Sequence, residues 1–184
     1  MDFVFMCAAN TSGATVIEET PLVHVTSTVV MATWMLDAAY KAGVQKFLWI
    51  SSTVVYPVAD YPIKEEEATG EVFHKYFFAG ETRRFIEKLC EMYAVHIKNS
   101  PMQVIVLRPS NFYGKYANFD LRESHVIPAL IRNVVERCDP IVIYGDGSDV
   151  RDFLYAGDFA NAAVMAMEKL KVFGPLNIGS GIAY

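Results

Sequence analysis

Short, continuous apolar runs alternate with amphipathic stretches along the first 110 residues. The runs cover residues 3–8, 47–50 and 104–107, and the first of them ends at a polar turn at 10–13. A strand with one solvated face would alternate apolar and polar positions, whereas an unbroken apolar run is typical of a parallel strand covered on both faces. We therefore expect three buried parallel strands in this part of the chain.

The stretches between these runs have helical periodicity. Apolar side chains recur every three or four residues over 21–42, with Pro21 near the start and Gly43 just past the end, as helix boundaries favour. A second helix is expected over about 76–96, after a polar loop at 56–71. The resulting order, β-α-β-α-β, predicts an α/β fold with a parallel sheet.

The pattern is looser after residue 110. The elements expected there, in chain order, are a loop at 111–123, a helix at 124–135, a strand at 141–144, a turn at 145–148, an apolar stretch at 153–155, a helix at 158–170 capped by Asp158, and a strand with a glycine turn at 176–181. Helix capping by an aspartate is favoured because its carboxylate accepts from free backbone N–H groups.

Composition and charge narrow the possible functions. The chain has 184 residues, a net charge of −5 and 53% apolar residues. A mildly acidic chain does not favour a nucleic-acid partner, which requires a basic surface, and no apolar run has the length expected of a membrane span. Cys7, Cys90 and Cys138 have no motif spacing, so we expect a reducing compartment, the cytoplasm, and no metal site.

Small and hydroxylated residues stand where the three predicted strands end. They are Ala8 and Ala9, Ser51 to Thr53, and Arg108 to Asn111. Ligands of open parallel sheets bind at the carboxyl ends of the strands. Small side chains there let a flat ligand approach the backbone, and hydroxyls can hydrogen-bond a substrate oxygen. The alternative is that Ser51 and Ser52 only terminate their strand.

Five segments resemble, in order, the motifs of one enzyme family. They are 4–9, a strand ending in Ala-Ala; 51–57, Ser-Ser-x-x-x-Tyr-Pro; 108–114, Arg-Pro-x-Asn-x-Tyr-Gly; 145–158, Gly-x-Gly followed by Arg-Asp-Phe-x-Tyr-x-x-Asp; and 177–181, Asn-Ile-Gly-x-Gly. The chain thus resembles the NAD-dependent epimerase/dehydratase family, the extended short-chain dehydrogenase/reductases that act on nucleotide sugars. Residues 124–130 look closest to the GDP-L-fucose synthase branch.

The resemblance implies a doubly wound, Rossmann-like sheet, NAD or NADP as cofactor, a nucleotide-sugar substrate and a homo-oligomer. It implies that residues 1–110 are part of the cofactor-binding domain and that 111–184 are part of a small substrate-binding region. The site residues that it implies are Ser52, Tyr76 and Arg83 for catalysis, Ala8, Ala9, Ser51 and Pro109 for the cofactor, and Thr53, Asn111, His125 and Arg151 for the substrate. The expected reaction is hydride transfer between the cofactor and a sugar carbon.

The catalytic positions depart from the family's Tyr-x-x-x-Lys dyad. In that dyad the Lys lowers the pKa of a phenol so that it can exchange a proton near neutral pH. Tyr76 lies at a family-like distance after Ser52, but Gly80 stands four residues further on. Arg83 fits the Lys position in the helix register, which then puts Ala79 at the Tyr position. The alternative for Tyr76 is an aromatic ring packed at a helix start.

Three candidate substrate residues also have structural alternatives. Asn111 can form an Asx turn after a proline. Arg151 can pair at the surface with Asp146 or Asp149, and His125 can be structural at a helix start. The family's dehydratases carry Asp-Glu where this chain has Thr53-Val54, which argues against dehydration.

The glycine-rich loop of the family is missing from this sequence. That loop, Gly-x-x-Gly-x-x-Gly, brings backbone N–H groups to the cofactor pyrophosphate. The motifs start at what resembles the family's fourth strand, so we expect an N-terminal truncation of roughly 60 residues. Two hypotheses therefore stay open: a nucleotide-sugar epimerase/reductase, or a catalytically inactive truncated relative that binds a nucleotide sugar or a partner chain.

Loss of the first three strands would leave residues 4–8 as an unpaired apolar edge. We predict that the isolated chain covers this edge by self-association or is poorly soluble. Sedimentation velocity, combined with a dye that reports exposed apolar surface, tests this prediction. A monodisperse monomer that binds no dye would contradict it.

Overall fold

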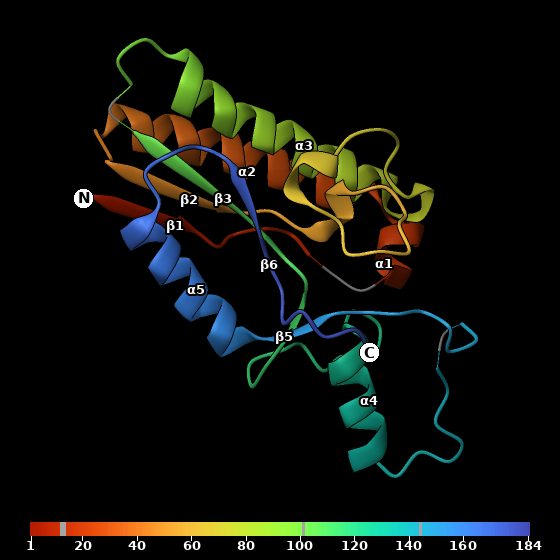
Figure 1. The fold of residues 1–184 in the computed structure, drawn as a ribbon. Helices are drawn as coiled ribbons and strands as arrows, with labels where there is room; N and C mark the ends of the chain where they lie inside the picture. Colours follow the sequence, from red (N-terminus) through yellow and green to blue (C-terminus); the bar gives the residue numbers. More distant parts are fainter. Residues whose placement is uncertain (12–13, 101, 144) are drawn as a thin grey trace.

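The computed structural model describes residues 1–11, 14–100, 102–143 and 145–184. Four strands form a parallel sheet in the order β1-β2-β3-β6 (Figure 1). Their bounds are Phe3–Met6 for β1, Lys46–Ile50 for β2, Gln103–Pro109 for β3 and Pro175–Ile178 for β6. The three strands predicted from apolar runs are confirmed, and β6 confirms the strand predicted near residue 176.

β1 lies at one edge of this sheet. It pairs with β2 from Phe3↔Lys46 to Met6↔Trp49, and no other strand of the described residues lies beside it. Successive side chains of a strand point to opposite faces. Met6 is accordingly buried, while Phe3 and Phe5 are 51% and 43% exposed. The predicted apolar edge is therefore present in this structure.

Helices cover both faces of the sheet (Figure 1). α2 (Leu22–Lys41) and α3 (Phe77–Glu91) lie on one face, and α5 (Ala156–Lys169) lies on the other. α3 continues into a π-helical turn at Met92–His96, so both long helices predicted between the strands are confirmed.

Alternation along β2 supplies the two halves of the core. Phe47 and Trp49 pack against residues of α2 and α3, whereas Leu48 packs against residues of α5. All three side chains are at most 1% exposed. An unbroken apolar run is therefore required here, because every position of the strand faces a helical layer.

The region after residue 110 differs from the prediction in three places. Asn111–Tyr113 forms β4, which pairs in parallel with β5 (Phe153–Tyr155), where the pattern predicts a loop. Residues 141–143 are not in a strand, and Tyr144 lies outside the described residues. Within the described chain no strand lies beside 141–143, so this apolar run has no hydrogen-bonding partner. Asp158 lies in the first turn of α5 and not at its cap, which is Tyr155.

Two more helices complete the chain. α4 (Val126–Val135) confirms the helix predicted at 124–135. α1 (Ala14–Glu19) is predicted by no pattern in the sequence; Ser12 and Gly13 of the predicted turn lie outside the described residues. β6 pairs with β3, so the chain returns to the main sheet after residue 110, and the two-region division stays a prediction.

α2 is the exception to the expectation that no segment could cross a membrane. By length and composition alone, Leu22–Lys41 meets the requirement for a span. The same composition is typical of a helix that lies in a protein core, and α2 buries a stripe of its side chains against β1 and α3. The length test is therefore weak evidence for a membrane span.

α3 approaches the segment after β2 most closely at Gly80. A Cβ at this position would lie 2.6 Å from the Val54 carbonyl oxygen and 3.0 Å from Val72 Cγ1. The backbone oxygen cannot move aside as a flexible side chain could. The absence of a side chain at residue 80 is therefore needed for this contact.

We predict that Gly80→Ala lowers the free energy of unfolding by about 1–3 kcal/mol through overpacking. The sign of this change in the free energy of unfolding is informative, because alanine in a helix interior is otherwise favoured over glycine by about 1 kcal/mol. Urea denaturation measures the change, with Gly174→Ala as the control since its Cβ would meet nothing within 4 Å. A Gly80→Ala protein as stable as the wild type would contradict the prediction.

Candidate active site

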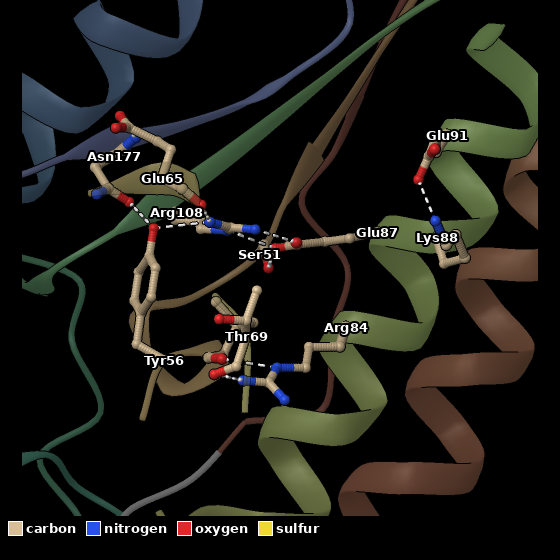
Figure 2. A network of polar contacts seen from close by, with 11 residues as sticks. Ser51, Tyr56, Glu65, Thr69, Arg84, Glu87, Lys88, Glu91, Arg108 and Asn177 are labelled. Carbon is tan, nitrogen blue, oxygen red and sulfur yellow. Dashed lines mark hydrogen bonds and ion pairs between the residues drawn. The ribbon is translucent and has the colours of Figure 1, made fainter. Parts of the chain in front are cut away.

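Polar side chains from three strands, one helix and one loop meet at the carboxyl end of the sheet (Figure 2). Ser51 directly follows β2, Arg108 and Pro109 end β3, and Asn177 lies in β6. The strands are parallel, so their carboxyl ends lie together. This is the position at which such sheets bind ligands.

A buried ion pair between Arg108 and Glu87 occupies the centre of the cluster. Arg108 Nη2 lies 2.6 Å from Glu87 Oε2, and Arg108 Nε donates to Oε1 at 3.0 Å. The two side chains are only 5% and 12% exposed. Ser51 Oγ also donates to Glu87 Oε1, at 2.5 Å. One carboxylate of α3 therefore binds the ends of both β2 and β3.

Tyr56 connects the ion pair to the loop that follows β2. Arg108 Nη1 donates to Tyr56 Oη at 2.7 Å and to the Glu65 carbonyl at 2.8 Å. Tyr56 Oη in turn donates to Asn177 Oδ1 at 2.6 Å. Burial raises the pKa of Tyr56, although the hydrogen bond and charge of Arg108 oppose the rise. The phenol is therefore neutral at pH 7 and can donate to Asn177.

The loop at 56–71 is fixed to both β6 and α3. The Asn177 backbone N–H donates to Glu65 Oε1 at 2.8 Å. On the other side, Arg84 of α3 donates to the carbonyls of Val55 at 2.8 Å and Gly70 at 2.6 Å. The loop is therefore held against the sheet through Glu65 and against α3 through Arg84.

Ser52 caps the 3₁₀ turn at Thr53–Val55. Its Oγ accepts a 3.3 Å hydrogen bond from the Val54 N–H, and a hydroxyl that accepts in this way can still donate its hydrogen. The hydroxyl of Ser51 donates its hydrogen to Glu87, so toward a cofactor this hydroxyl could only accept a hydrogen bond. The two serines thus have different roles at the strand end.

Arg83 reaches the same strand end from α3. Its Nη1 donates to the Ile50 carbonyl at 3.1 Å. Burial lowers the pKa of the guanidinium to about 10, and the charge of Glu87 opposes this fall. Arg83 is therefore a cation at pH 7. It is bonded to the carbonyl of Ile50, which stands two residues before Ser52 in the chain.

Tyr76 does not form a one-turn dyad with Arg83. It precedes α3, and its ring packs edge-on against Phe73 with 5.7 Å between the ring centroids. Seven residues, about two helical turns, separate it from Arg83, whereas Ala79 is about one turn away. The assignment of the family's Tyr position to Tyr76 or to Ala79 stays a prediction.

The remaining cofactor candidates lie at the expected strand ends. Ala8 and Ala9 follow β1 and are exposed and half-buried, respectively, and Pro109 is buried at the end of β3; the substrate candidate Thr53 is half-buried after β2. Small side chains therefore border β1 where a flat ligand could approach its end.

The candidate substrate residues are held by local contacts. Asn111 Nδ2 donates to the Asp152 carbonyl at 3.4 Å, and Arg151 pairs with Asp149 at 2.7 Å, the surface pairing given above as its alternative. His125 occupies the N-cap position of α4 without a side-chain cap hydrogen bond, and burial lowers its pKa, so its ring is neutral at pH 7. The structure brings none of these side chains into the Arg108–Glu87 cluster.

A hollow of about 290 Å³ lies beside β4, β5 and α4. Its lining is mostly apolar and aromatic, and includes Tyr113, Phe119, Ile127, Pro128, Ile131 and Tyr155. Two tyrosine rings and an apolar wall suit a flat, partly apolar ligand group.

No site role was predicted from the sequence for Glu87, Arg108, Tyr56 and Asn177 of this cluster, nor for Asp152. Glu87 stands four residues after Arg83, so it lies on the same helix face one turn later. That spacing is the signal that could have identified it. Asp152 stands inside the Arg-Asp-Phe motif, where only Arg151 was given a role.

A parallel sheet between two helical layers, with its polar cluster at the carboxyl ends of the strands, defines an α/β protein of the Rossmann-like, nucleotide-binding type. Residues 1–179 match the NAD dependent epimerase/dehydratase family, and the chain belongs to this family. The family and fold predicted from the motifs are therefore confirmed.

Individual relatives agree with this assignment. The chain is 32% identical to a GDP-L-fucose synthase of Sinorhizobium fredii over 190 residues, 97% of this chain and 58% of the relative. A GDP-L-fucose synthetase of Naegleria fowleri bound to NADP has 25% identity and a TM-score of 0.84, covering 97% of this chain and 59% of that one. A UDP-glucose 4-epimerase of Thermotoga maritima with UDP-glucose has 26% identity and a TM-score of 0.84, covering 100% and 57%. The chain spans little more than half the length of these relatives.

Asp152 links the glycine turn at 177–181 to Ser110, which directly follows β3. Its carboxylate accepts from the Ser180 N–H at 3.0 Å, the Gly181 N–H at 2.7 Å and the Ser110 hydroxyl at 2.7 Å. Burial acts to raise the pKa of Asp152, but these hydrogen bonds outweigh it and hold the pKa below its ordinary value. The ionised carboxylate therefore stabilises the fold.

We predict that Asp152→Asn lowers the urea midpoint at pH 7. A lowered folded-state pKa contributes stability that is complete above the ordinary aspartate pKa of about 4 and is lost as the pH falls through the folded-state value. The difference from wild type should therefore shrink in acid. Asp60→Asn, in an exposed loop, is the control, and a difference that stays constant from pH 7 into acid would rule out this role.

Proposed function

We propose that the chain forms part of a nucleotide-sugar epimerase/reductase that transfers a hydride between NAD(P) and a sugar carbon. One observation carries the proposal: the cation of Arg83 donates to the Ile50 carbonyl, two residues before the hydroxyl of Ser52. A charge and a hydroxyl at one strand end suit the handling of a sugar hydroxyl. The similarity to GDP-L-fucose synthases supports this reaction class.

The donor set at the strand ends fits the nicotinamide half of NAD(P). Arg83 has N–H groups beyond the one bonded to Ile50, and Ala8 and Ala9 leave room beside β1. These residues, with Pro109 and Ser51, would hold the cofactor, and the bound cofactor would supply the hydride acceptor or donor. The sequence has no Gly-x-x-Gly-x-x-Gly run, so no residue is assigned to the pyrophosphate.

The chain's own groups would orient the sugar. In the proposal Ser52 donates a hydrogen bond to the sugar oxygen, Arg83 provides the positive charge, and Tyr76 is the phenol available for proton transfer. Thr53, Asn111, His125 and Arg151 are proposed to contact the substrate. Relatives bound to NADP and to UDP-glucose support this ligand pair.

The alternative is an inactive relative that binds a nucleotide sugar or a partner chain without turnover. Ala79 supports it, because no phenol stands one turn before Arg83 on α3. The two proposals differ in whether a reaction follows binding. A turnover measurement therefore separates them.

We also propose a cytoplasmic homo-oligomer. All three cysteines have free thiols, which supports a reducing compartment. Apolar side chains on α2 and α3 face solvent, among them Trp34 at 69% and Phe85 at 51% exposure. Exposed side chains of this kind support an interface between copies of the chain.

We predict that the chain binds NADH or NADPH and that Arg83→Met weakens the binding at least about tenfold, since a buried charged hydrogen bond is worth about 1.5–3 kcal/mol. Calorimetry measures the affinities. Arg83→Lys should retain part of the affinity, and Lys88→Met is the control because Lys88 is exposed on the same helix. Equal affinities for Arg83→Met and Lys88→Met would overturn the role of Arg83.

The reaction itself is tested by incubating the chain with NAD or NADP and UDP-linked or GDP-linked sugars while following the absorbance of reduced nicotinamide. Turnover that Ser52→Ala diminishes supports the enzyme. Nucleotide binding without turnover supports the inactive relative, and absence of both rejects the proposed function.

A further inference from the structure

We infer that Glu87 is a positioning residue that sets the conformation of residues 50–55, and with it the placement of Ser52. The inference deepens the proposed function, since Ser52 is the hydroxyl proposed to meet the sugar. Glu87 itself is not assigned a contact with substrate or cofactor. It acts through Ser51 and Arg108.

The first step is that Glu87 joins two strand ends. Its Oε1 accepts from Ser51 Oγ at 2.5 Å and from Arg108 Nε at 3.0 Å, while Oε2 accepts from Arg108 Nη2 at 2.6 Å (Figure 2). The Ser51 backbone N–H also donates to the Leu107 carbonyl of β3 at 2.7 Å. Ser51 is therefore fixed through both its side chain and its backbone, directly before Ser52.

The second step is that one face of α3 holds the whole segment. Gly80, Arg83 and Glu87 recur at three- and four-residue spacing, so they lie on one face of the helix. Gly80 lies against the Val54 carbonyl, Arg83 donates to the Ile50 carbonyl and Glu87 accepts from Ser51. Arg84, beside this face, donates to the Val55 carbonyl at 2.8 Å.

These contacts bracket Ser52 from both sides. Residues 50 and 51 are fixed before it, and residues 54 and 55 after it, each by a group on α3. The Ser52 side chain contributes only the cap to the Val54 N–H. Its position therefore depends on α3, and Glu87 provides the charged contact nearest to it in the chain.

The third step concerns why a carboxylate is used here. Burying an ion pair is expensive, and apolar residues of similar volume often stabilise a protein as well or better. A carboxylate with two oxygens, in contrast, fixes three donors in defined directions. The geometry points to a role in placing groups, beyond the packing of α3 on the sheet.

The primary test is hydrogen–deuterium exchange on the full chain. Glu87→Gln preserves the shape of the side chain but removes its charge, and one of its end groups becomes a donor facing Arg108 or Ser51. Exchange of the amides at 51–55 should rise about tenfold or more, while β1 stays unchanged. Glu91→Gln is the matched control, because Glu91 lies one turn further on α3 and pairs with Lys88 and His96 at the surface.

The second readout is turnover, if the wild type has it. A displacement of about 1 Å can reduce a rate about hundredfold, so Glu87→Gln should lower kcat by about tenfold to hundredfold with cofactor affinity nearly unchanged. Glu87→Asp keeps the carboxylate with a shorter reach and should recover part of kcat. If Glu87→Gln does not fold, Glu87→Asp and Ser51→Ala carry the same comparison.

The outcomes separate this inference from the proposed function. Unchanged exchange at 51–55 in the Glu87 variants, or a rise equal to that of Glu91→Gln, overturns the inference whether or not the chain is active. A measurable wild-type kcat that Glu87→Gln leaves intact also overturns it. A wild type without turnover rejects the enzyme, and the exchange data then decide the role of Glu87 alone.

Discussion

The buried ion pair between Arg108 and Glu87 is the interaction on which the rest of the site depends. Two charges removed from water destabilise a fold unless each remaining donor and acceptor finds a partner. Arg108 meets this requirement with the Glu87 carboxylate, the Tyr56 hydroxyl and the Glu65 carbonyl. Those partners come from α3 and from the loop at 56–71. The pair is therefore stable only when α3, the loop and the strand ends are in place together.

The strands of the main sheet could be predicted because burial on both faces requires several apolar residues in succession. Phe47, Leu48 and Trp49 are apolar in succession since each faces a helical layer, and the run alone indicates this. β4 has no such apolar run, because its three residues become a strand by pairing with β5, more than 35 residues later in the sequence. The run at 141–143 shows the converse. Its apolar residues favour a strand, but pairing is non-local, and the described chain places no strand beside it.

The site was predictable where a motif fixes the spacing and not where the fold creates the contact. Ser52 and Arg83 lie at the strand end that the motifs indicated. From the sequence, Glu87 is expected to be a solvated charge on an amphipathic helix. Its partner Arg108 stands 21 residues further along the chain, and only folding brings the two side chains together. Arg108 lies in the motif at 108–114, but the sequence does not show which group it pairs with, so its role could not be predicted. Its burial, at 4% exposure, is a property of the packed sheet and not of the sequence around it.

The same contacts show which groups of α3 hold the segment after β2. Gly80, Arg83, Arg84 and Glu87 hold the segment after β2 through a close backbone approach and hydrogen bonds, and none of these contacts uses the side chain of residue 79. The residue one turn before Arg83 is therefore not among the groups that hold this segment. The geometry of the strand end and the presence of the proton-transfer group are therefore separable.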